Sequence, residues 1–275
     1  MAETTLIAWT DHTANIWMGC LKVSAGCEKC YAETLTKNRM GLEVWGPAKT
    51  TRRQFVKSTM AHVRAWDREA RAAGQSARVF CMSLGDFFED HPDANRFRPA
   101  AWDLIRECDA LDWQILTKRP ERVAEYLPAD WGAGWDHVWL GTSIEDARVA
   151  HRAVTLAAVP AKTRFLSYEP AIGPLAQAVN LAGIHWVIYG GESGPGYRPE
   201  GTPADPKLWA RDMRARCQAE GVAYFHKQSA AWRTEIGIEL DGVIVRDYPR
   251  PRRPLGAVLP AGQGDLFAAP RPRHA

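Results

Sequence analysis

Short apolar runs alternate with longer amphipathic stretches along most of the chain after residue 75. The runs are rich in β-branched and aromatic residues, which is typical of buried strands. They are ARVFCMSLGD (77–86), WQILTKRP (113–120), VWLGTSIED (138–146), RFLSYEP (164–170), WVIYGGESG (186–194) and VAYFHKQ (222–228). An earlier run, TLIAWTD (5–11), predicts one more strand that leads directly into a cysteine-rich loop.

Amphipathic stretches at 52–74 and 205–221 predict helices. In the second, we expect Asp205 to be the N-cap, Pro206 to take the first helical position and Gly221 to end the helix. Strands that alternate with helices indicate parallel βαβ units. Six or seven such units in series predict an α/β fold with a full or partial (β/α) TIM-type barrel, and a doubly wound open sheet is the alternative.

Each predicted strand has an apolar first half and a polar end. The six polar ends read SLGD, TKRPER, TSIED, SYEP, GGESG and HKQ. In a parallel barrel the carboxyl ends of the strands open onto one face, where active sites are built. The pattern therefore predicts a shared pocket lined by lysines, glutamates and serines.

The chain has 275 residues and a formal net charge of +3, which is compatible with nucleic acid without requiring it. A barrel-like domain is expected over 1–247, and the Pro- and Arg-rich segment 248–275 predicts a flexible tail. No signal peptide and no membrane-spanning run are evident, so a cytoplasmic location is expected. The phosphate-binding pattern G-x-x-x-x-G-K-[ST] is absent, which argues against a P-loop NTPase.

Three of the six cysteines, Cys20, Cys27 and Cys30, fall within eleven residues. In a cytoplasmic protein such a cluster favours metal binding or redox chemistry over disulfides. One reading adds His12 as a fourth ligand of a structural zinc. The other is a [4Fe–4S] cluster on three thiolates, with one iron left open for a small ligand. The remaining three cysteines are expected to pack in the core.

The cysteine loop after the first predicted strand resembles that of radical S-adenosylmethionine (SAM) enzymes. Their usual spacing is C-x3-C-x2-C with an aromatic residue before the third cysteine, whereas this chain has C-x6-C-x2-C with Tyr31 after it. More closely, the chain resembles the phage Gp37/Gp68 family, a three-Cys-motif domain of unknown function. The matching stretches are WTDHTANIWMGC, SAGCEKCYAE, LTKRPER, WLGTSIED, FLSYEP, IYGGESGPGYRP and FHKQ.

The resemblance implies a [4Fe–4S] cluster on the three cysteines, with SAM chelating the open iron and an electron donor as partner. SAM would be cleaved to a 5′-deoxyadenosyl radical that abstracts hydrogen from the substrate. A GGE segment holds the SAM amino group in such enzymes but normally follows the second strand, whereas here it follows the sixth. The residues assigned to cofactor binding are Tyr31, Ser83, Glu145, Gly190, Gly191, Glu192 and Ser193.

Three further polar residues at strand ends are assigned to catalysis: Lys118, Glu169 and Lys227. Lys118 and its neighbour Arg119 can pair with a carboxylate or phosphate. Glu169 precedes Pro170 and is therefore biased towards extended geometry. Ser143 has a local explanation instead, because S-x-x-D at 143–146 resembles a helix capping box.

Two stretches point to nucleic acid. KTTRRQFVK (49–57) is basic and lies near a predicted helix start, where phosphates dock. In QGDLF, Gln263, Leu266 and Phe267 resemble the short peptides that bind bacterial sliding clamps. Base modification or repair is then the expected task of an enzyme. The alternatives are a zinc-stabilised nucleic-acid-binding phage accessory protein without redox chemistry, and a barrel enzyme of another class with structural cysteines.

Overall fold

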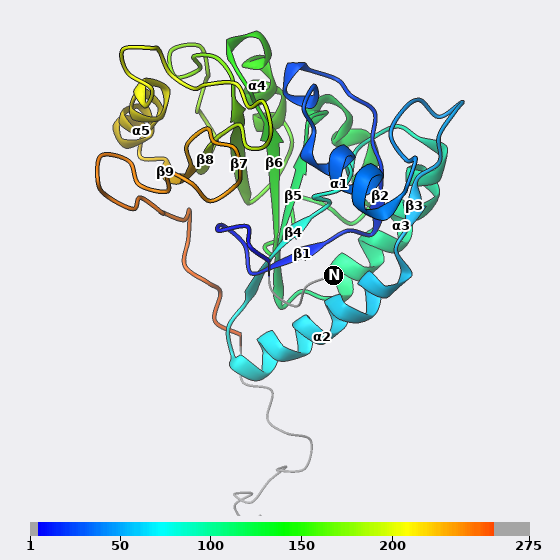
Figure 1. Ribbon diagram of the computed structural model, residues 1–275. Helices are drawn as coiled ribbons and strands as arrows, with labels where there is room; N and C mark the ends of the chain where they lie inside the picture. The colour runs from blue at the N-terminus through cyan, green and yellow to red at the C-terminus, as the bar shows by residue number, and fades with distance from the viewer. Residues whose placement is uncertain (1–4, 256–275) are drawn as a thin grey trace, which may run out of the picture.

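The computed structural model describes residues 5–255 and shows a mixed α/β fold built on one seven-stranded parallel sheet (Figure 1). The strand order is β1-β4-β5-β6-β7-β8-β9, so consecutive strands of this sheet are neighbours. The strands are β1 (His12–Ala14), β4 (Ala77–Cys81), β5 (Leu111–Thr117), β6 (Val138–Ser143), β7 (Thr163–Ala171), β8 (Trp186–Gly191) and β9 (Ala223–Gln228).

Helices and short turns connect the strands, and the larger helices lie on the outer side of the sheet (Figure 1). The α-helices are α1 (Tyr31–Met40), α2 (Lys57–Ala73), α3 (Pro92–Glu107), α4 (His151–Ala157) and α5 (Leu208–Glu220). A small antiparallel pair, β2 (Trp17–Met18) with β3 (Gln54–Phe55), brackets the cysteine loop. Residues 5–255 also contain four 3-10 helices: η1 (Ala25–Cys27), η2 (Pro120–Arg122), η3 (Ala124–Tyr126) and η4 (Ala147–Val149).

The sheet is curled into a half-barrel, and in the described residues β1 and β9 remain unpaired with each other. The prediction of a barrel-like parallel sheet is confirmed in this open form; the closed version is not formed. All six predicted strands after residue 75 are present. Alternating strand residues face opposite sides, as the period of a strand requires.

One face of the sheet packs on the helices and the other packs inside the curl. The inner cluster consists of Trp9, Phe80, Trp139, Phe165, Trp186, Ile188 and Phe225, all buried. Residue 141 of β6 must be glycine, because a Cβ there would come within 2.2 Å of the Phe165 ring. These rings fill the amino-terminal half of the half-barrel and leave its carboxyl end open.

The prediction of a first strand at 5–11 is wrong, because the first strand of the sheet is His12–Ala14. The backbone turns back at Thr10, whose N–H donates to the carbonyl of Ile7. This turn carries Trp9 into the inner cluster, so its apolar side chain closes the interior rather than extending a strand. Burial, not ladder pairing, explains the apolar pattern of this stretch.

The N-cap prediction for α5 is displaced by two residues, since Lys207 is the N-cap. The prediction that Pro206 takes the first helical position is also wrong, because the helix begins at Leu208. Asp205 instead accepts from the backbone N–H of Lys207 in the turn before the helix. Gly221 ends the helix in the left-handed conformation, as expected. At 143–146 the cap is Asp146, which accepts from the N–H of Arg148, whereas Ser143 is the last residue of β6.

The segment 245–255 runs along β9 and then crosses beneath the amino ends of the strands. The backbone N–H of His226 donates to Val245, and the Trp186 indole donates to the carbonyl of Asp247. Arg253 then pairs with buried Asp112 at 2.7 Å. The rest of the predicted tail, with Gln263, Leu266 and Phe267, lies outside the described residues. None of the described helices has the length and hydropathy that crossing a bilayer requires.

Candidate functional site

A cavity of about 520 Å³ opens at the carboxyl ends of the strands. Trp9 and Phe80 of the inner cluster contribute to its lining, and the cysteine loop forms one wall. All six predicted polar strand ends contribute side chains. The lining residues from these ends are Ser83, Asp86, Thr117, Lys118, Ser143, Ser167, Glu169, Glu192, Ser193 and Lys227, together with the backbone of Gly191. The shared pocket predicted from the sequence is therefore formed.

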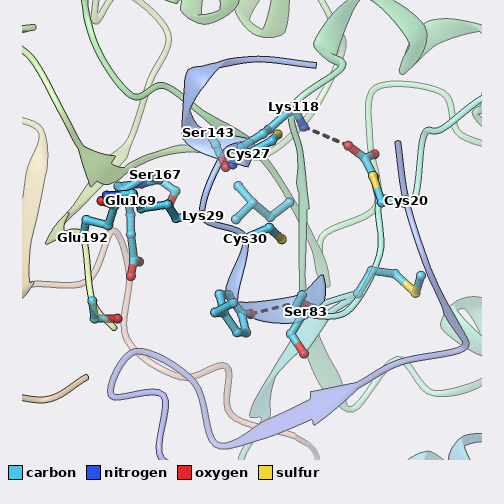
Figure 2. Close-up of a pocket in the computed structure, with 18 of the residues that line it drawn as sticks. Cys20, Cys27, Lys29, Cys30, Ser83, Lys118, Ser143, Ser167, Glu169 and Glu192 are labelled. Carbon is cyan, nitrogen blue, oxygen red and sulfur yellow. Dashed lines mark hydrogen bonds between the residues drawn. The ribbon is translucent and has the colours of Figure 1, made fainter. Parts of the chain in front are cut away.

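All three clustered cysteines line this cavity. They are free thiols and partly exposed, whereas Cys81, Cys108 and Cys217 are buried in the core as expected. Cys27 and Cys30 lie close together in the loop, and Cys20 lies across from them (Figure 2). Cys30 is the N-cap of α1, where the backbone N–H groups of Ala32 and Glu33 favour its thiolate, although burial leaves its pKa raised.

Arg119 holds the start of the cysteine loop against the sheet. Its guanidinium donates to Asp86 at 2.8 Å, to the carbonyl of Leu21 at 2.6 Å and to the sulfur of Cys20 at 3.5 Å. Burial and the charge of Asp86 raise the pKa of the Cys20 thiol, while Arg119 opposes this rise. Arg119, expected to bind a ligand, thus orients the loop in this structure.

Arg53, from the basic stretch 49–57, is buried and unavailable to a phosphate. It forms a two-pronged hydrogen-bonded pair with Glu89 at 2.8 and 2.9 Å. Its remaining donors reach the carbonyls of Val44 and Gly46. A buried guanidinium needs this number of acceptors, so its role is to brace the loop that follows α1.

Glu145 lies beneath the cysteine loop and is not among the residues that line the cavity. It accepts from Ser24 at 2.7 Å and pairs with Arg152 at 3.1 Å. Gly26 packs directly on it, because a Cβ there would come within 2.3 Å of the Glu145 side chain. In this structure the Glu145 carboxylate therefore positions the cysteine loop and does not make the expected contact with a cofactor site.

Arg198 joins the cysteine loop to the GGES segment. Its guanidinium and backbone N–H donate to Glu192, and the same guanidinium reaches the carbonyl of Ala25 and the carboxylate of Glu28. Burial alone would raise the pKa of Glu192, but the hydrogen bonds from Arg198 hold it below its usual value. Glu192 thus presents an ionised carboxylate in the wall of the cavity.

Glu169 and Lys227 meet inside the cavity as an ion pair. Gly190 of the intervening strand makes room for them, since a Cβ there would lie 2.8 Å from the carboxyl carbon of Glu169. Gly191 is required for another reason, because its Cβ would lie 2.1 Å from the backbone nitrogen of Ala230. The two glycines serve packing around the site, and only Gly191 lines the cavity.

Lys118, Tyr31, Ser83 and Ser193 all line the cavity, as the sequence led us to expect. The Lys118 ammonium lies 3.6 Å from Glu145, and its side chain is largely buried beside the cysteine loop. The Tyr31 hydroxyl donates to the carbonyl of Ser83 at 2.9 Å (Figure 2). This bond links the start of α1 to the end of β4.

His12 is not placed to complete a zinc site with the three cysteines. It lies in β1, and its ring stacks on Trp66 of α2 at a centroid distance of 4.4 Å. Within residues 5–255, no group of three His, Cys, Asp or Glu side chains is arranged to hold a metal ion. In this conformation Cys20 faces Arg119, and Cys27 contacts the hydroxyl of Ser24.

The donor set nevertheless fits a group that binds three thiolates. Three free thiols from one loop share one cavity, and Lys118 and Arg119 are positioned to offset their negative charge. Thiolates are the ligands that iron–sulfur clusters use. The three residues match such a group in kind and number and line one cavity, although their side chains are not gathered into a metal site in this conformation.

Sequence reasoning missed several lining residues. Asp86, which also accepts from Thr117 at 2.7 Å and from the backbone of Lys118, stood in the quoted end SLGD but received no role. Ser167 was likewise visible in SYEP. Trp232 and Arg233 lie in the loop after β9, beyond any strand end, so no periodic signal marked them.

Comparisons with known proteins give a family and one structural likeness. The family described as "Protein of unknown function (DUF5131)" matches residues 4–249. A solved structure of a spore photoproduct lyase mutant is similar over 80% of this chain and 75% of its own, with 13% identity and a TM-score of 0.47. No curated protein matches the chain.

Proposed function

Since the chain belongs to the DUF5131 family of proteins of unknown function, we propose its activity from its own site: a radical SAM-type iron–sulfur enzyme. The observation that carries the proposal is that three free thiols of one loop line the cavity at the carboxyl ends of the strands. The resemblance to the phage Gp37/Gp68 family and to radical SAM enzymes supports the same reading.

In this proposal Cys20, Cys27 and Cys30 hold a [4Fe–4S] cluster. When bound, the cluster would supply the electron that cleaves SAM to a 5′-deoxyadenosyl radical. The chain's own residues fix the ligands and exclude water. Arg119 orients the loop through Cys20, and Glu145 orients it through Ser24.

The wall formed by Gly191, Glu192 and Ser193 is the proposed site for SAM, with Tyr31 and Ser83 opposite. Glu192 is ionised and held by Arg198, so it offers a fixed negative group to an ammonium. Neutral and charged groups that are already oriented bind a ligand without further ordering cost.

Three residues remain for the substrate side: Lys118, Glu169 and Lys227. In the Glu169–Lys227 pair, the carboxylate would accept a proton and the ammonium would donate one. Lys118 adds a positive charge near the thiols. Two lining cations, Lys29 and Arg233, have no ion-pair partner among the described residues, which supports an anionic substrate such as nucleic acid.

Anaerobic purification and reconstitution with iron and sulfide test the proposal. We expect a brown protein with bound iron and sulfide that forms 5′-deoxyadenosine from SAM after reduction. Cys20→Ala, Cys27→Ala and Cys30→Ala should each lose iron, whereas Cys217→Ala, a buried core thiol, serves as the matched control and should keep it.

The opposite outcome is equally clear. A colourless protein that retains one zinc through purification, with no 5′-deoxyadenosine, would overturn the proposal in favour of a zinc-stabilised nucleic-acid-binding protein. Iron loss in Cys217→Ala as well would show that the cysteine variants act through misfolding.

A further inference from the structure

Trp232 differs from every other tryptophan of the chain. All twelve lie within the described residues; eight are buried, three are half-buried, and Trp232 has 64% of its surface exposed. It also lines the cavity, in the loop that follows β9. An indole held in water at the mouth of a site is a typical recognition group, because it offers a large flat contact area.

The loop that carries Trp232 is braced on both sides. Ala231 exchanges backbone hydrogen bonds of 3.0 Å with the segment 192–194. After the tryptophan, the side-chain oxygen of Gln228 accepts from the hydroxyl of Thr234 at 2.7 Å and from the N–H of Glu235 at 2.9 Å. The hydrogen bonds of Ala231, Thr234 and Glu235 therefore fix the loop in the conformation that exposes the indole.

A cation accompanies the exposed ring. The guanidinium of Arg233 lies 4.8 Å from the centroid of the Trp232 ring and is itself exposed. Together the two side chains offer an aromatic surface next to a positive charge that has no ion-pair partner in the described residues.

Part of the positive charge of the lining is available to an anion. Six cationic side chains line the cavity: Lys22, Lys29, Lys118, Arg119, Lys227 and Arg233. The three carboxylates of the lining, Asp86, Glu169 and Glu192, each have a cationic partner within the structure. Four of the six cations are ion-paired as well, namely Lys22 with Glu33, Lys118 with Glu145, Arg119 with Asp86 and Lys227 with Glu169. Among the described residues, Lys29 and Arg233 are the lining cations without an ion-pair partner, so an anion that approaches Trp232 meets the unpaired charge of Arg233.

We propose that Trp232 and Arg233 form a docking site for an unpaired nucleotide of a nucleic-acid strand, with its base stacked on the indole and its phosphate on the guanidinium. The site deepens the proposed function and rests on it, since the strand docked there presents the neighbouring nucleotide to the cavity. Aromatic stacking combined with basic residues is how proteins bind single strands without reading sequence.

Fluorescence anisotropy of the full chain with a short labelled single-stranded oligonucleotide tests the site, with DNA and RNA as separate arms. Trp232→Ala should weaken binding roughly ten- to a hundredfold, while Trp232→Phe, which keeps a ring, should retain most of the affinity. Arg233→Gln should lower the slope of affinity against salt by about one, as loss of a phosphate contact does. Arg96→Gln, an exposed arginine of α3 away from the cavity, is the matched control and should change neither quantity.

Comparison with a strand that lacks bases separates stacking from charge. We expect an abasic strand and polyphosphate to bind more weakly than the oligonucleotide. Their affinities should not change in Trp232→Ala. Unchanged affinity in Trp232→Ala, or no binding of either DNA or RNA by the wild-type chain, would overturn the docking site. Iron content and 5′-deoxyadenosine formation, measured on the same preparations, report on the proposed function separately.

Discussion

Lys227 and Glu169 form an ion pair of 2.5 Å inside the cavity, although 58 positions separate them in the sequence. They come from β9 and β7, and the strand between them, β8, carries glycine at the crossing point. The pair therefore depends on three strands at once. It is the clearest chemical feature of the cavity on the side away from the thiols.

Lys227→Met tests this pair. Removal of the ammonium leaves the partly buried Glu169 carboxylate without its partner, which should destabilise the fold by about 1–3 kcal/mol. Urea unfolding measures the loss. Glu169→Gln in the same chain should recover part of it, because the unpaired charge is gone; full additivity of the two changes would show that the residues are not coupled.

Gly190→Ala tests the crossing point without touching either charge. The added Cβ would lie 2.8 Å from the Glu169 carboxyl carbon, so the carboxylate must move and the pair should weaken. We expect about 1–2 kcal/mol of lost stability by urea unfolding. Gly221→Ala is a control for general backbone effects, since nothing lies near a Cβ there, although its positive φ adds strain of its own.

Arg119→Lys should loosen the cysteine loop. Lysine keeps a charge for Asp86 but has no planar fork to reach Leu21 and Cys20 as well. We expect trypsin to cleave after Lys22 or Lys29 roughly tenfold faster in the variant, consistent with the loss of one or two hydrogen bonds. Arg122→Lys, at a half-buried arginine of η2 whose partners are Asp90, Glu125 and Tyr126, should leave the cleavage rate unchanged. Equal rates in all three proteins would mean that Arg119 does not hold the loop.

His226 predicts a pH dependence of stability. Burial lowers its pKa from 6.5 to about 4, while its Nε2 contacts the carbonyl of Gly237. The unfolded chain binds this proton more readily than the folded one, so stability is full above about pH 6.5 and falls as the pH drops towards 4. Between about pH 7.5 and 5 the loss should reach roughly 2 kcal/mol, measured by urea unfolding.

His226→Phe is the control for that measurement. The substitution keeps an aromatic ring against Tyr189, on which the imidazole stacks, and removes the titrating group. The variant's stability should vary less with pH over the same range. A variant with the same pH profile as the wild-type chain would assign the dependence to other groups.

Strands and their polar ends could be predicted because both signals are local. Each run needs an apolar half to enter the core and a polar half to leave it, and parallel order then brings the ends together. The same local signal misled at 5–11, where Trp9 is apolar because it fills the interior and not because it extends a strand.

The partners of charged residues could not be predicted, because they depend on packing between distant segments. Arg53 and Glu145 look like ligand-binding residues in the sequence, yet Glu89, Ser24 and Arg152 occupy them. Trp232 was missed because its loop shows no hydrophobic periodicity and because the exposure of a side chain in a loop cannot be read from the sequence.

The crossing segment 245–255 has a consequence for how the protein is made. Tyr248 packs on Trp186, and Arg253 neutralises Asp112, which has no exposed side-chain surface. A nascent chain therefore cannot form these two contacts until residue 253 has left the ribosome. Any shortened version intended for expression should end beyond that point. Earlier termination would expose the Trp186 ring and leave the buried Asp112 without Arg253.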